Sequence, residues 1–182
     1  MPSPIVHLTA GYVVYRVARH VTASRKPDPV LLGGAMGLAL LPDFDSGLGI
    51  LFGDFGRFHN SQSHSLLVGA GVALVTGLLL LAVGNRRPAL WLALTLACYE
   101  LHILLDYFTW GRGVMAWWPI TKERFSSPAL LFYGLHWSQG FVSSRHLITL
   151  VTEMPIALAT IAAVRMMSRR GVNLMARQRS TG

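Results

Sequence analysis

His102 and Asp106 are the two residues whose types and spacing most directly suggest chemistry. They lie four positions apart near the end of a long apolar stretch, Pro88 to Phe108. In an α-helix, residues at this spacing project from the same face, one turn apart. An imidazole and a carboxylate so placed can share a divalent cation, or the aspartate can simply orient a packed histidine by a hydrogen bond. Because ionisable residues in a membrane-like stretch usually serve a function, we treat the pair as a candidate metal site.

Histidine or aspartate also occurs near the ends of other apolar stretches. Each such residue has a simpler interpretation: an interfacial histidine at a helix start, solvated carboxylates at a helix end, or histidines in a loop. Two carboxylates directly after Leu-Leu-Pro favour at least one of Asp43 and Asp45 as a metal ligand, and we expect His64 to be a stronger ligand than His59. The candidate metal ligands are therefore His7, Asp43, His59, His64, His102 and Asp106.

The carboxylates have further possible roles. Asp43, Asp45 or Asp106, if not bound to the ion, could act as the general base for a water nucleophile. Glu153 lies inside the last apolar stretch, where a carboxylate is costly unless it is paired or faces a cavity. It could be a ligand, could hydrogen-bond a ligating histidine as Asp45 also could, could carry protons, or could only hydrogen-bond within the helix bundle.

The mixture of imidazole and carboxylate donors favours a divalent metal, with zinc first and manganese or iron as alternatives. More than four donors could hold either one ion or two. Such a centre lowers the pKa of a bound water to about 7 and polarises an ester or phosphoryl oxygen. The chain has 1 cysteine, Cys98, within an apolar stretch. We interpret it as a core residue, which argues against a cysteine-based structural zinc site.

The elements that would position these residues are apolar helices. The chain of 182 residues is 52% hydrophobic and 13% charged, whereas soluble domains carry roughly 25% charged residues. Three stretches are long and apolar enough to cross a membrane: Ser65–Gly84, Pro88–Phe108 and His146–Met167. Two shorter stretches, Ile5–Val21 and Val30–Leu41, predict an N-terminal helical hairpin. The sequence therefore predicts an all-α, polytopic membrane protein with three spans plus this hairpin.

We expect residues 1–167 to form one helical domain and residues 168–182 to form a basic tail. A glycine-rich loop is predicted for Ser46–Ser63, because glycines recur there between polar residues. Proline is predicted to interrupt the last span at Glu153–Pro155. The segment Pro128–Gly134 could form a short interfacial helix.

Other polar residues near the candidate site are expected to be structural. Ser65 can cap the helix that follows it, and Glu100 should point away from the face that carries His102. His136 and His146 are typical of histidines at a membrane interface.

The basic residues indicate a membrane orientation. The net charge is +8, but lysine and arginine gather at the ends of apolar stretches, as in membrane proteins, so we expect membrane lipid as a partner and no direct nucleic-acid binding. The larger set, expected to be cytoplasmic, comprises Arg16, Arg19, Arg25, Lys26, Arg86, Arg87, Arg165, Arg169, Arg170, Arg177 and Arg179. The other set comprises Arg57, Arg112, Lys122, Arg124 and Arg145.

The candidate ligands lie at the helix ends opposite the larger basic set. They should therefore meet at one face of a bacterial-type inner or plasma membrane, the non-cytoplasmic face, with the C-terminal tail in the cytoplasm against anionic lipid. Arg57, Arg112, Lys122 and Arg124, on the same face as the ligands, could attract an anionic substrate or a phospholipid headgroup, or they could only snorkel to the interface.

These residues together resemble the YdjM-like family, inner-membrane-associated proteins described as LexA-binding and as metal-dependent hydrolases. The resemblance covers about residues 5–125 and is carried by His7, Leu41–Asp45, His59, His64, Ser65, His102–Asp106, Phe108–Gly111 and Trp118–Pro119. The sequence departs from the family at Asn60 and Ser63, where arginine and threonine are usual. The resemblance implies a helical membrane protein with a hydrolytic metal centre, and it implies no particular substrate.

The resulting hypothesis is a membrane-bound metal-dependent hydrolase acting on a phosphoester or other ester of a lipid-like substrate. The helical His-x-x-x-Asp pair is also similar to that of zinc-dependent phospholipases C and related nucleases, which favours phosphoester chemistry. One alternative is a non-catalytic protein with a structural metal site, closed by four protein ligands, that binds a regulatory partner. Another is a small ion or proton transporter using Glu153 and the histidines, although Ser65–Gly84 offers such a path almost no polar residues.

Overall fold

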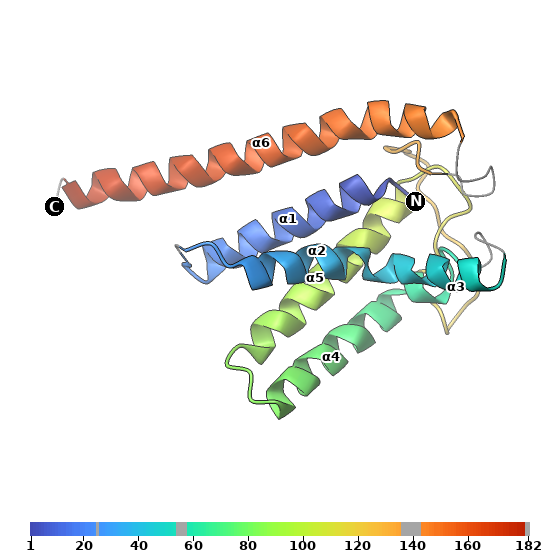
Figure 1. The fold of residues 1–182 in the computed structure, drawn as a ribbon, viewed down its shortest axis with the longest axis horizontal. Helices are drawn as coiled ribbons and strands as arrows, with labels where there is room; N and C mark the ends of the chain where they lie inside the picture. Colours follow the sequence, from blue (N-terminus) through green and yellow to red (C-terminus); the bar gives the residue numbers. More distant parts are fainter. Residues whose placement is uncertain (25, 54–57, 136–142, 181–182) are drawn as a thin grey trace.

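The computed structural model describes residues 1–24, 26–53, 58–135 and 143–180 (Figure 1). Arg25, Arg57 and His136 lie outside the described residues. The helices are α1 (Pro4–Val21), α2 (Pro29–Leu40), η1 (Leu41–Phe44), α3 (Asp45–Leu51), η2 (Gln62–His64), α4 (Leu66–Ala82), α5 (Pro88–Tyr107) and α6 (Arg145–Ser180), where η denotes a 3₁₀-helix. Among the described residues there is no β-strand, and the segment between α5 and α6 contains two isolated bridges. The all-α prediction is confirmed.

Local sequence signals explain where several helices begin. Proline occupies the first turn of α1, α2 and α5, where its missing N–H costs nothing. The Asp28 carboxylate caps α2 by accepting from the backbone N–H of Leu31 at 2.9 Å. Ser65 caps α4 as expected, since its hydroxyl oxygen accepts from the backbone N–H of Leu67 at 3.2 Å. Its own hydroxyl donates to the carbonyl oxygen of Trp118 at 2.6 Å, which ties the start of α4 to the segment after α5.

Helix α1 packs against α2, α5 and α6, and α5 also packs against α2 and α4. Small residues allow the close contacts: a Cβ atom on Gly11 of α1 would lie 2.7 Å from the carbonyl oxygen of Ala35 in α2. Glycine at this position therefore lets the two backbones approach, as in helix pairs within lipid. Cys98 is a free thiol buried in the core that α1, α2 and α5 form, as predicted.

Two helical segments are long and apolar enough to cross a membrane, Pro88–Tyr107 and Arg145–Ser168. Helix α4 is apolar but has 17 residues, and at about 1.5 Å per residue it is shorter than a hydrocarbon core of about 30 Å. It is shorter than the predicted stretch Ser65–Gly84 because Ser65 serves as the N-terminal cap and Val83 as the C-terminal cap. At its other end the chain turns at Gly84, with a left-handed φ of +72°.

Three local predictions were wrong. The loop predicted for Ser46–Ser63 begins with α3, which continues directly from η1. Helix α6 runs through Pro155 without interruption, as proline-containing helices do when neighbouring structure supports them. The segment Pro128–Gly134 is not helical, because the backbone of Phe132 pairs with the chain just after α5. The backbone of α6 also continues through the predicted basic tail to Ser180.

The two ends of the bundle differ in charge and composition. The α1–α2 turn, the α4–α5 turn and the end of α6 lie toward one end of the molecule (Figure 1). The N-terminus, α3 and the C-terminal end of α5 lie toward the other. The bundle thus separates the turns rich in arginine and lysine from the segments that carry the candidate ligands.

Candidate metal centre

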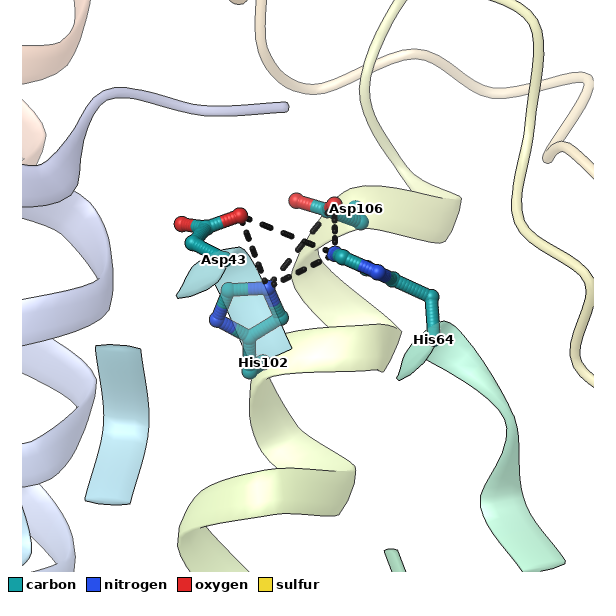
Figure 2. A group of neighbouring side chains, drawn as sticks. All are labelled: Asp43, His64, His102 and Asp106. Atoms are coloured by element: carbon teal, nitrogen blue, oxygen red, sulfur yellow. Dashed lines mark hydrogen bonds and ion pairs between the residues drawn. The ribbon is translucent and has the colours of Figure 1, made fainter. Parts of the chain in front are cut away.

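Four candidate ligands from three separate segments converge at the end of α5 (Figure 2). We call Asp43, His64, His102 and Asp106 the inner group. His64 Nε2 lies 3.2 Å from Asp106 Oδ2, 3.6 Å from Asp43 Oδ1 and 3.1 Å from His102 Nε2. His102 Nε2 lies 3.5 Å from Asp43 Oδ1 and 3.9 Å from Asp106 Oδ2. The predicted i, i+4 pair on α5 therefore points into a shared cluster.

These separations fit a tetrahedral ion. Nitrogen and oxygen ligands at about 2.0–2.2 Å from a zinc ion would lie about 3.3–3.6 Å apart, and the five separations range from 3.1 to 3.9 Å. Both carboxylate oxygens of Asp43 and both of Asp106 are buried without a hydrogen bond of regular geometry to any described residue. Burying a carboxylate without such hydrogen bonds costs folding free energy, and a cation bound between the two carboxylates would offset that cost.

The ring orientation of His102 is fixed by the backbone of α2. His102 Nδ1 lies 2.7 Å from the carbonyl oxygen of Ala39. A carbonyl only accepts, so Nδ1 carries the proton and the neutral ring presents the lone pair of Nε2 to the inner group. Second partners of this kind fix the tautomer of metal-binding histidines and raise their basicity.

His64 is oriented by a carboxylate. Its Nδ1 lies 3.2 Å from Asp45 Oδ2 and 3.0 Å from the hydroxyl of Ser63. Burial opposes protonation of His64, but its close contacts with the carboxylates of Asp106, Asp43 and Asp45 outweigh burial and hold the pKa of His64 well above its usual value. The same negative field that favours a proton on this histidine favours a metal cation in its place.

His7 joins the cluster through the opposite oxygen of Asp106. Its Nε2 lies 3.3 Å from Asp106 Oδ1, and its ring stacks on His102 with centroids 3.8 Å apart. His7 is fully buried. The structure thus brings His7 beside the inner group, against the Asp106 oxygen that faces away from His64.

A second set of candidate ligands lies beside the first. Asp45, His59 and His64 form the outer group. His59 Nδ1 lies 3.1 Å from Asp45 Oδ1 and 3.6 Å from Asp43 Oδ1, and it contacts the hydroxyl of Ser46 at 3.0 Å. The side chains of Asp43, Asp45 and His59 are 13%, 7% and 8% exposed, whereas that of His64 is 0% exposed. Access from outside is therefore along the edge where Asp43 of the inner group meets Asp45 and His59 of the outer group.

The ionisation of the outer group follows from its contacts. Burial raises the pKa of Asp45, but the hydrogen bonds from His59 and His64 outweigh burial, so the pKa of Asp45 lies below its usual value. Burial is the dominant influence on His59 and lowers its pKa, despite its contact with Asp45. Asp45 is thus an anion and His59 a neutral imidazole near neutral pH, which are the forms that bind metal ions.

Comparison with known proteins identifies the group of proteins to which this arrangement belongs. A family model described as YdjM inner membrane protein matches residues 1–177. The chain belongs to the YdjM family. It is also 37% identical over 109 residues to inner membrane protein YbcI of Escherichia coli (strain K12), an alignment that covers 55% of this chain and 60% of that protein. The chain thus spans less than two thirds of the length of this relative. No solved structure matches the chain.

Membership of the YdjM family confirms the resemblance seen in the motifs. Together with the two apolar helices α5 and α6, it supports a location in the membrane. The contacts described above bring the motifs of separate segments together, because Asp43 and His64 meet the His102–Asp106 pair of α5 only in the folded chain.

At one departure from the family pattern, the backbone has a special conformation. Asn60 has a left-handed φ of +55°, which asparagine tolerates better than most residues. Arg124 donates to the carbonyl oxygen of Asn60 at 2.6 Å and to the hydroxyl of Ser61 at 3.0 Å, and Arg112 donates to the carbonyl oxygen of His59. Two of the arginines considered for substrate attraction therefore hold the loop that carries His59, while Lys122 is exposed.

The sequence analysis missed several residues that build the site. Ser63 donates to Asp45 Oδ2 at 2.5 Å, and the Tyr99 hydroxyl donates to the carbonyl oxygen of Ser63 at 2.6 Å. Ser46, whose hydroxyl contacts His59, is a third residue of the site that was missed. The only signal in the sequence was that Ser46 follows Asp45 and Ser63 precedes His64, because the contact with Tyr99 is made between segments far apart in the chain.

Two carboxylates of the apolar helices lie away from both groups. Glu153 accepts from the backbone N–H of Ser3 at 2.6 Å, and its other oxygen has no hydrogen-bond partner among the described residues. Glu153 therefore links α6 to the start of α1, apart from the candidate ligands. Glu100 lies against Gly69 of α4, which confirms that it points away from the face of His102.

Proposed function

We propose that this YdjM-family protein is a membrane-bound metal-dependent hydrolase that acts on a phosphoester or other ester of a lipid-like substrate. The observation that carries the proposal is the inner group: four nitrogen and oxygen donors that lie within 4.8 Å of one another, buried beside a second group of the same chemistry. A divalent ion, zinc first, would polarise an ester or phosphoryl oxygen there and make a water available as the nucleophile at neutral pH.

In this proposal the inner group holds the first ion. Asp43, His64, His102 and Asp106 supply the ligands, and His7 holds Asp106 by its second oxygen. The full burial of His64, His102 and Asp106 would protect this ion from exchange with solvent.

The outer group provides the approach for substrate. Asp45 and His59 are slightly exposed, as is Asp43 of the inner group, and these three residues can hold a second ion that has fewer than four protein ligands. An open position of this kind is what distinguishes catalytic from structural metal sites. Asp45 is better suited to binding and orienting than to general-base catalysis, because its lowered pKa makes it a weak base.

The proposed topology follows from charge. We place the turns near Arg16 and Arg86, and the end of α6, on the cytoplasmic side, and the metal centre at the opposite face. Helix α4 would then cross the bilayer as the third span beside α5, with which it packs. Tilt and local thinning of the bilayer can accommodate its length.

One observation favours a second candidate function, a structural metal site in a protein that binds a regulatory partner. Four protein ligands around one ion make a closed site, as in structural zinc sites. If the inner group alone binds metal, its four ligands would leave no position for a substrate. The two candidates therefore differ in whether the outer group also binds an ion.

Metal analysis of detergent-purified protein tests the proposal. We expect bound divalent metal in the wild type and a loss of most of it in His64→Ala and in His102→Ala. His20→Ala is the matched control, because His20 is an exposed histidine near the C-terminal end of α1. Equal metal content in all four proteins would remove both histidines as ligands. One ion per chain in the wild type would favour the structural candidate, and two would favour the hydrolase.

A further inference from the structure

A cavity of about 180 Å³ lies between α1, α5 and α6. On α1 it is lined by Val6, Ala10 and Val13, which lie on one face of the helix. Leu105 of α5 and Ala157 of α6 line the other walls. The cavity extends over about 10 Å along α1, at about 1.5 Å per residue from Val6 to Val13. Two of its walls come from helices that are apolar enough to cross a membrane.

The polar atoms nearest the cavity are already satisfied. Thr9 and Thr160 contribute to the lining, but each hydroxyl donates to the carbonyl oxygen four residues earlier in its own helix, at 2.8 Å in both cases. A cavity whose lining offers no free side-chain donor and only two hydroxyl oxygens as acceptors is poorly suited to ordered water, and apolar cavities bind apolar ligands. The lining thus selects an apolar occupant.

One end of the cavity adjoins the metal centre. Val6 precedes His7 and Leu105 precedes Asp106, and these two polar residues contact each other at 3.3 Å. From this end the cavity leads away along α1 past Ala10. A molecule with an apolar chain in the cavity would therefore have the polar end of that chain beside the inner group.

We propose that this cavity binds one acyl chain of a membrane phospholipid, with the ester end of the chain toward Leu105 and the methyl end toward Val13. The proposal rests on the proposed function in so far as it makes that lipid the substrate of the metal centre. An acyl chain suits the apolar lining and the position of the cavity between helices that face lipid, and its ester-proximal part fills the cavity, since a chain spans about 15 Å in one leaflet.

Photolabelling of the protein tests the proposal. The protein is placed in nanodiscs of phosphatidylethanolamine and phosphatidylglycerol that contain a trace of phosphatidylglycerol with a diazirine near either the ester or the methyl end of one chain. We expect the ester-proximal probe to label peptides containing Leu105 and the methyl-end probe to label peptides containing Val13. The opposite order, or labelling confined to exposed faces of α4 and α6, would overturn the proposal.

Filling the cavity provides the matched control. Ala157→Phe places a ring in the cavity and should reduce labelling of the Val13 peptide several-fold, whereas Ala159→Phe on the exposed face of the same helix should leave it unchanged. Ala157→Val should give an intermediate loss, which guards against a phenylalanine variant that does not fold. Equal labelling in all variants would contradict the proposal.

Metal content separates this proposal from the proposed function. Ala157→Phe should retain the metal of the wild type, because it lies outside both ligand groups. Loss of labelling with full metal content supports the cavity as the chain site. A wild type that is labelled as expected but binds no metal would overturn the hydrolase and leave a lipid site.

Discussion

The inner and outer groups share His64 but differ in what holds their ligands, and Asp43 of the inner group, at 13% exposed, lies at the edge between them. Two inner ligands, His102 and Asp106, lie on the long helix α5 and have no exposed side-chain area. The outer residues Asp45 and His59 are 7% and 8% exposed, and His59 lies on an irregular loop held by arginine contacts to its carbonyl oxygens. The same residue types, a few ångströms apart, thus form one set suited to retaining an ion and another suited to admitting a substrate.

This difference in support has an energetic meaning. Ligands on a packed helix are already in position before the ion binds, so little conformational entropy is lost on binding. Loop-borne ligands are more easily rearranged, which weakens binding but allows the coordination to change when a substrate arrives. We therefore expect tight binding at the inner group and weaker, exchangeable binding at the outer group.

The largest expected effect separates the two groups directly. Asp106→Asn removes the inner charge that His64 and His7 contact, so metal affinity should fall by more than about 100-fold, since even partners outside the ligand shell are worth about 10–100-fold. His59→Ala should remove only the weaker ion and should abolish any hydrolytic activity while the tighter ion remains. Competition with a series of chelators measures both affinities. If His59→Ala and Asp106→Asn lose the same ion to the same extent, the two groups are one site.

The convergence of the inner group was predictable, because its parts follow from simple spacing. The i, i+4 relation of His102 and Asp106, and the return of each hairpin to one end of the bundle, are enough to place Asp43 and His64 near them. The burial of these residues follows from the apolar helices that carry them.

The division between the groups was not predictable. Asp43 and Asp45 are separated by one residue, but they lie at a 3₁₀-helix, where residues two apart point about 120° apart. Asp43 consequently joins the inner group, whereas Asp45 orients His64 and contacts His59. The hydrogen bond from His102 to Ala39 was likewise hidden, because it depends on how α2 packs against α5.

A smaller effect is expected from the residue that links the groups. Asp45→Asn keeps the shape of the side chain but removes its charge, so the hydrogen bonds to His64 and His59 weaken. We expect the affinity of the inner group to fall by about 10–100-fold. Isothermal titration of metal into stripped protein measures this change. Glu123→Gln, an exposed carboxylate remote from the ligands, is the control. An unchanged inner affinity would show that Asp45 does not orient His64.

The smallest expected effect concerns the hydroxyl that fixes the outer loop to α5. Tyr99→Phe removes the hydrogen bond to the carbonyl oxygen of Ser63, and the free energy of unfolding should fall by about 1 kcal/mol, the typical net value of one such bond. Its effect on metal should be larger on the weaker ion than on the tighter one, because Ser63 contacts Asp45 and His64 at the end of the loop, whereas His102 is held by α2. Thermal unfolding in detergent and chelator competition measure the two changes, with Tyr133→Phe as the control. A greater loss at the tighter ion would mean that the loop, and not α5, sets the affinity of the inner group.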